Sequence, residues 1–205
     1  MTLSQALLHT GTAVFAITGV LAAARQNMDI LSLLVIGVVT AIGGGTLRDM
    51  MLGVPVFWLA DPSYVSVSAL AALGTFFFEQ RFRETERALL YLDGVATALF
   101  AVLATGKALQ LGFGPGVALV MGVITGIGGG LLRDVITGHA TILLRRELYM
   151  TPILAGGLLY VLLTRHTAVD RGAALLAAVA VVSALRCAAL RWAWEFPAWL
   201  TYRSG

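Results

Sequence analysis

The chain has 205 residues, of which 59% are hydrophobic and only 12% are charged, and its formal net charge is +3. Ordinary soluble domains carry about 25% charged residues, so this composition excludes a typical water-soluble protein and indicates a single polytopic membrane domain over residues 1–205. The basic residues lie between apolar segments, where they report membrane topology rather than nucleic-acid binding. The one cysteine, Cys187, excludes an intrachain disulfide, and no His/Cys cluster has the spacing of a metal site.

Seven apolar segments are long enough to cross a hydrocarbon layer of about 30 Å. They cover about residues 3–24, 30–47, 61–78, 88–106, 116–132, 148–164 and 172–194. The second segment resumes after Arg48-Asp49 and continues to Ala60. The third opens with Asp61-Pro62, a favourable helix start because proline suits the first helical position.

The sequence repeats itself at an interval of 85 residues. Between Leu34 and Gly53, 13 of 20 residues are identical to their counterparts between Leu119 and Gly138. Both copies contain Gly-Gly-Gly-x-x-Arg-Asp, and the same shift pairs Tyr64 with Tyr149. This identity indicates an internal duplication.

Each copy holds three predicted spans, so the second copy is expected to enter the membrane from the opposite side. The expected fold is therefore all-α, with seven transmembrane helices. An inverted three-plus-three repeat covers about residues 3–80 and 88–165, and one extra helix covers about residues 172–194. The second and fifth helices are expected to be broken at their glycine triplets.

Basic residues between the spans predict the orientation. Eight of them lie on the side of the C-terminus and three on the other: Arg25, Arg81, Arg83, Arg87, Arg145, Arg146, Arg191 and Arg203 against Lys107, Arg165 and Arg171. The cytoplasmic side carries the excess of Lys and Arg. We therefore expect a multi-pass protein of the inner (plasma) membrane with its N-terminus outside and its C-terminus in the cytoplasm. Three tryptophans beside Arg191 are expected to form an interfacial belt: Trp192, Trp194 and Trp199.

Three consecutive glycines occur at matching positions in the two copies: Gly43, Gly44 and Gly45, and Gly128, Gly129 and Gly130. Each glycine lowers the stability of a helix by about 1 kcal/mol relative to alanine. Two such triplets at matching positions therefore indicate that the glycines have a structural or functional role. A helix broken at glycines exposes backbone groups that coordinate ions. The alternative is close helix packing, which small residues allow. The matched pair favours a central permeation site.

Arg48-Asp49 and Arg133-Asp134 follow the triplets, inside apolar segments where charges are costly without partners or water. Adjacent residues on a helix point about 100° apart, so neither pair is expected to close onto itself. Instead, we expect the arginine of one copy to meet the aspartate of the other near the repeat axis, lining a polar passage. Alternatively, both pairs lie at span ends and reach water.

Four further residues are candidates for the ion pathway. Asp93, in the fourth span, either caps a helix start or faces an internal cavity. Lys107 ends the same span and either reaches the interface or lies at the pore mouth. Thr40 and Thr125 precede the triplets and either offer hydroxyls to an ion or bond to their own helix. Arg186, without a repeat partner, is expected to reach the interface.

Enzyme signatures are absent from the sequence. It contains no HExxH, no P-loop and no Gly-x-Ser-Gly with a distant histidine, and its three histidines lie far apart. We expect neither catalysis nor a cofactor.

The doubled Gly-Gly-Gly-x-x-Arg-Asp, the three-plus-three repeat and the seventh span together resemble the prokaryotic trimeric intracellular cation (TRIC) channels. The same domain has been labelled a putative glycine transporter. This resemblance implies a homotrimer with a pore inside each subunit, lined by kinked second and fifth helices and permeable to monovalent cations, potassium at least as well as sodium.

Two functions fit these features. The first is a passive cation channel permeable to K⁺ or Na⁺; the alternative is a secondary transporter of glycine or another small solute. Inverted repeats and broken helices are typical of transporters, whereas the lack of a dedicated coupling carboxylate deep in a span favours the channel. The expected partners are further copies of the chain, membrane lipids and monovalent cations.

Overall fold

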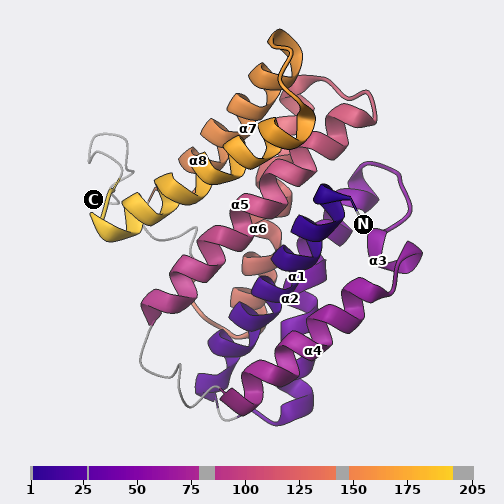
Figure 1. Ribbon diagram of the computed structural model, residues 1–205. Helices are drawn as coiled ribbons and strands as arrows, with labels where there is room; N and C mark the ends of the chain where they lie inside the picture. Colours follow the sequence, from indigo (N-terminus) through magenta and orange to yellow (C-terminus); the bar gives the residue numbers. More distant parts are fainter. Residues whose placement is uncertain (1, 27, 79–85, 142–147, 196–205) are drawn as a thin grey trace, which may run out of the picture.

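The computed structural model describes residues 2–26, 28–78, 86–141 and 148–195, which are mostly helical (Figure 1). These residues form eight α-helices and one 3₁₀ turn, η1 (Ala24–Gln26). The helices are α1 (Leu3–Ala23), α2 (Ile30–Met51), α3 (Phe57–Ala60), α4 (Ser63–Phe78), α5 (Glu86–Gln110), α6 (Pro115–Ile136), α7 (Met150–His166) and α8 (Arg171–Arg191). Each predicted span therefore has a helix, but the predicted continuation of the second span to Ala60 is wrong, because α2 ends at Met51 and Phe57–Ala60 form the separate single-turn helix α3.

Within the described part of the chain, five helices are long and apolar enough to cross a membrane: α1, α2, α5, α6 and α8. α4 has 16 residues and α7 has 17, or about 24–26 Å at 1.5 Å per residue. Large apolar side chains such as Leu31, Leu70 and Phe77 are exposed on the outside of the bundle, as expected where a protein faces lipid. The chain is a multi-pass membrane protein.

α5 is the central helix of the bundle. Of the residues in its most apolar stretch of 18, 67% are buried, compared with 33–44% in the other four long helices. It packs against α1, α6, α7 and α8, and Figure 1 shows it between α1 and the pair formed by α7 and α8. Three polar residues on α5, Asp93, Thr97 and Thr105, are therefore buried inside the protein.

The ends of the helices follow from local sequence. Asp29 caps α2, where its carboxylate accepts hydrogen bonds from the backbone N–H groups of Leu31 and Ser32. Pro115 occupies the first turn of α6. The predicted helix start at Asp61-Pro62 is confirmed within one residue, because α4 begins at Ser63.

α2 and α6 end in the same way. Gly53 and Gly138 follow the two helices with φ of 67° and 64°, a left-handed conformation that glycine adopts without strain. The next N–H bonds back to the carbonyl of Asp49 in α2 and of Asp134 in α6. Both ends are therefore Schellman caps, which explains the shared glycine that closes each copy of the motif.

The predicted interruption of the second and fifth spans is wrong. α2 continues as α-helix through Gly43–Gly45 to Met51, and α6 continues through Gly128–Gly130 to Ile136. Neither Arg-Asp pair interrupts its helix.

Several residues used for the orientation lie outside the described residues or have side chains that the structure does not describe: Arg25, Arg81, Arg83, Arg145, Arg146, Trp199 and Arg203.

Candidate ion pathway

The glycine triplets form the contact between α2 and α6. A Cβ added to Gly44 would overlap the carbonyl oxygen of Thr125, and one added to Gly129 would overlap that of Thr40. A Cβ on Gly128 would lie 3.1 Å from the Cα of Gly44. The backbones of α2 and α6 are thus in direct contact. This arrangement is the close helix packing that was the alternative interpretation of the triplets.

The outer glycines of the triplets make room for other groups. A side chain on Gly43 would meet Leu132, one on Gly45 would meet the ring of Phe57, and one on Gly130 would lie 3.3 Å from a carboxylate oxygen of Asp93. The absence of side chains at Gly45 and Gly130 therefore leaves space for Phe57 and Asp93, which contact the Arg-Asp pairs.

Thr40 and Thr125 flank this contact but bond within their own helices. Thr40 Oγ1 donates to the Ile36 carbonyl at 2.7 Å, and Thr125 Oγ1 donates to the Met121 carbonyl at 2.6 Å. Both residues are fully buried. The hydroxyl hydrogens are therefore committed to the backbone.

Arg48, Asp49 and Lys107 form the first charged group, which we term the Lys107 cluster. Arg48 Nε and Lys107 Nζ each donate to Asp49 Oδ1 at 2.7 Å, and the Phe57 N–H donates to Oδ2 at 2.9 Å. Arg48 and Asp49 are buried, whereas the Lys107 side chain is 31% exposed. Lys107 is thus the accessible member of the cluster.

Asp93, Arg133, Asp134 and Tyr149 form the second group, the Asp93 cluster. Arg133 Nη1 donates to Asp93 Oδ1 at 2.7 Å, and Arg133 Nε donates to Asp134 Oδ1 at 2.8 Å. The Tyr149 hydroxyl donates to Asp93 Oδ2 at 3.0 Å. Asp93 and Arg133 are almost completely buried, so their charges depend on one another for solvation.

The predicted crossed pairing is wrong. Each arginine bonds the aspartate next to it, because its long side chain can curl back to the adjacent carboxylate. One pair joins Lys107 and the other joins Asp93, and these residues are 14 apart on α5, about 21 Å at 1.5 Å per residue. α2 and α6 therefore carry their charges to opposite ends of α5.

The structure also decides between alternatives for single residues. Asp93 lies seven residues after the start of α5, inside the network above, so it does not cap that helix. The expectation that Arg186 reaches the interface is wrong, because its side chain is fully buried. Its guanidinium lies 4.3 Å from the ring centre of Tyr149, which makes it a neighbour of the Asp93 cluster.

Sequence reasoning missed two partners of these clusters, Phe57 and Tyr149. Phe57 begins the unanticipated α3, and no sequence pattern indicates its contact with Asp49. Tyr149 carried a usable signal, since the repeat aligns it with Tyr64, and Tyr64 lies beside Phe57 with ring centres 4.9 Å apart.

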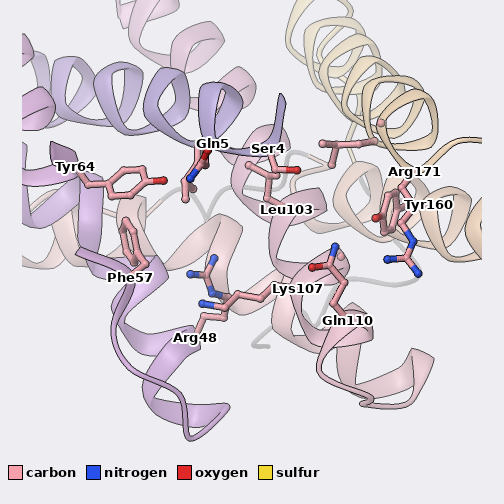
Figure 2. A pocket seen from close by; sticks show the side chains of 14 residues that line it. Ser4, Gln5, Arg48, Phe57, Tyr64, Leu103, Lys107, Gln110, Tyr160 and Arg171 are labelled. Carbon is pink, nitrogen blue, oxygen red and sulfur yellow. The ribbon is translucent and has the colours of Figure 1, made fainter. Parts of the chain in front are cut away.

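A cavity of about 310 Å³ lies beside the Lys107 cluster. Figure 2 shows Arg48 and Lys107 converging at one wall, with Phe57 and Tyr64 on the left. Arg171, from the start of α8, lies on the opposite side. No acidic residue lines this cavity among the residues that the structure describes. The space is therefore positively charged, and Asp49 is the carboxylate behind its wall.

Metal binding finds no support at either cluster. No group of three or more His, Cys, Asp or Glu residues that could hold a metal ion occurs in the described ranges. The clusters can act as fixed charges and hydrogen-bond donors.

Comparison with known proteins identifies the family. A family model described as "Glycine transporter" matches residues 5–80 and again residues 90–165. The crystal structure of a TRIC channel orthologue from Rhodobacter sphaeroides superposes with a TM-score of 0.88 and 40% identity, covering 95% of this chain and 100% of that one. The chain belongs to the prokaryotic TRIC family.

Other TRIC-family relatives are bacterial membrane proteins. The inner membrane protein YadS of Escherichia coli is 39% identical over 197 residues, 95% of each chain. A membrane protein of Vibrio cholerae is 39% identical over 193 residues, 91% of this chain and 79% of its own. The two segments that match the "Glycine transporter" family model begin 85 residues apart, the same interval as the sequence repeat.

Proposed function

We propose that this TRIC-family chain is a passive channel for monovalent cations, with a pathway inside each subunit and K⁺ passing at least as well as Na⁺. The observation that carries the proposal is the pair of buried charged clusters at opposite ends of α5, on either side of the α2–α6 contact. Ionised residues inside a membrane protein are costly and mark ion pathways. The Rhodobacter sphaeroides relative is named a cation channel, which supports the same conclusion.

The proposed pathway is closed in this conformation. α2 and α6 touch at Gly44 and Gly129 without space for a methyl group, and Asp49 is occupied by the cations of Arg48 and Lys107. In an open state, the Lys107 ammonium leaves Asp49 and a permeating cation takes its place. Lys107 suits this role because it is partly exposed and has a flexible stem.

The proposal includes the arrangement in the membrane. Seven helices cross it as an inverted three-plus-three repeat followed by α8, with the N-terminus outside and the C-terminus in the cytoplasm of a bacterial cell. Three copies assemble, each with its own pathway. No cofactor and no catalytic step belong to this function.

Transport of glycine or another small zwitterion is the second candidate. It is favoured by the cavity, where Arg48, Lys107 and Arg171 supply cations that suit a carboxylate, and by the description of the family model. A transporter would cycle between states that open the two clusters in turn.

One experiment separates the two candidates. Purified protein is placed in planar bilayers under a KCl gradient, and in proteoliposomes loaded for uptake of labelled glycine. Unitary currents that reverse near the potassium potential support the channel. The absence of current together with protein-dependent glycine uptake would establish the transporter instead.

A further inference from the structure

A second cavity, of about 450 Å³, lies between the start of α5 and the end of α8. The described residues that line it are Arg87, Leu90, Tyr91, Leu190 and Arg191. Arg87 is the second residue of α5, Arg191 is the last of α8, and both are exposed. The described lining contains two guanidinium groups and no carboxylate, and the positive end of the α5 dipole lies beside it. The charge of the site therefore fits an anion.

Arg186, four residues before Leu190 on α8, is a third arginine near this cavity, although it does not line it. Its Nη1 donates to the Leu148 carbonyl at 3.1 Å, but its Nε and Nη2 are buried without an acceptor among the described residues. Buried donors are nearly always satisfied by protein, water or a bound group. These two donors can therefore bind a polar group from outside the described residues.

Arg186 lies on α8 one helical turn from the cavity residue Leu190. Leu190 follows Arg186 by four residues on α8, and Leu90 precedes Gly94 by four residues on α5. A Cβ on Gly94 would lie 3.4 Å from the Cβ of Arg186, so the two helices are in contact at that depth. The cavity residues and Arg186 thus belong to one seam between α5 and α8.

The level of the seam favours a lipid over a free anion. Trp192 and Trp194, directly after α8, are exposed and stack with ring centres 5.8 Å apart. Exposed tryptophans at the end of a membrane helix mark the headgroup region. Leu90 and Leu190 provide an apolar surface next to the two arginines, which suits the first methylenes of an acyl chain.

We propose that the seam between α5 and α8 binds the phosphate of an anionic phospholipid. Arg87 and Arg191 contact the phosphate through charge-assisted hydrogen bonds, and the acyl chains run along Leu90 and Leu190. Arg186 donates its free N–H groups to an oxygen of the same lipid or to a water that the lipid encloses. The site is distinct from the Lys107 cluster and its cavity, which lie at the other end of α5, and it does not depend on what the protein transports.

Native mass spectrometry tests the proposal. The full chain is delipidated, then equilibrated in mixed micelles that contain equal amounts of phosphatidylglycerol and phosphatidylcholine. We expect preferential retention of phosphatidylglycerol, reduced about ten-fold in the double variant Arg87→Gln/Arg191→Gln through loss of two charge-assisted contacts. The double variant Arg87→Lys/Arg191→Lys is expected to keep much of the preference.

Arg165→Gln is the matched control, because Arg165 is also an exposed arginine but lies at the end of α7 beside a different cavity. It is expected to retain phosphatidylglycerol like the parent. Equal retention by the parent and the double glutamine variant would overturn the proposal, as would a lack of headgroup preference in the parent. Displacement of the lipid by an equal concentration of inorganic phosphate would overturn the assignment to a lipid. If the double variant does not fold, the two single glutamine variants provide the same comparison.

Discussion

Asp49 is the residue on which the Lys107 cluster depends. Three donors converge on its carboxylate, from Arg48, Lys107 and the Phe57 backbone. A buried ion pair contributes little net stability, but removing one partner leaves a charge that nothing compensates. The Asp49 carboxylate therefore determines the electrostatic potential at the wall of the cavity, because Arg48 and Lys107 both donate hydrogen bonds to it.

We expect Asp49→Asn to reduce cation conductance without preventing assembly. The substitution leaves two cations beside the pathway with no carboxylate between them. A unit charge about 4 Å from the permeating cation, at the dielectric constant of water of about 80, changes the barrier by about 1 kcal/mol, or roughly five-fold in conductance. Single-channel recording in KCl measures the effect, and size-exclusion chromatography checks assembly. Asp61→Asn, at an exposed helix start, is the control; conductance equal to the parent in Asp49→Asn would make the carboxylate purely structural.

At the scale of helices, the α2–α6 contact is the most constrained feature of the bundle. Gly44 and Gly129 each lie against a backbone carbonyl of the other helix. The sequence correctly indicated that the triplets have a common purpose, but it could not choose between a break and a close contact. Three glycines lower the stability of an isolated helix, yet packing inside a bundle outweighs local propensity.

Gly44→Ala should destabilise the protein by about 2 kcal/mol or more, as expected for overpacking against backbone that cannot move aside. Thermal unfolding in detergent would then shift down by several degrees. Gly74→Ala in α4 is the matched control, since a Cβ there has nothing within 4 Å. It should leave stability unchanged or raise it by up to about 1 kcal/mol through better helix propensity. Similar unfolding temperatures for the two variants would contradict the packing interpretation.

The cap of α2 predicts a dependence on pH. Hydrogen bonds from the Ser32 backbone, then the Ser32 hydroxyl, hold the pKa of the Asp29 carboxyl below its usual value of 3.8. The cap's contribution is therefore complete above the unfolded-state pKa and is lost as the pH falls through the lower folded-state pKa. Hydrogen exchange in the first turn of α2, after correction for the intrinsic rate, should be constant above pH 4 and rise below it. In Asp29→Asn the same curve should be flat across this range.

Considered as a whole, the molecule is unequal at its two ends. The Lys107 cluster borders a cavity with three basic residues, whereas Asp93 and Arg133 of the Asp93 cluster are almost completely buried. If cations pass between them, their currents in the two directions should differ. Single-channel recordings in symmetrical KCl should therefore rectify, and Lys107→Gln should reduce the rectification while Lys107→Arg preserves it. A linear current–voltage relation in the parent would contradict this expectation.

The sequence predicted the parts of this architecture that depend on short-range patterns. The lengths of the apolar segments located the helices, and the 85-residue interval identified the equivalent positions in the two copies. Both properties depend only on the order of residues along the chain. The distant partners of Asp49, Asp93 and Arg186, such as Lys107 for Asp49, could not be read in the same way. They come from helices distant in sequence, and their pairing depends on which face α5 turns toward α2, α6 and α8.

The contact at Gly44 and Gly129 also has a mechanical consequence. Helices usually pack by interdigitating side chains, so a change in their crossing angle requires side chains to leave one set of grooves and enter another. At these two glycines no side chain stands between the backbones. A change in the crossing angle of α2 and α6 therefore requires little rearrangement of side chains at this point, and we expect a rotation about the contact to move the Lys107 and Asp93 clusters together.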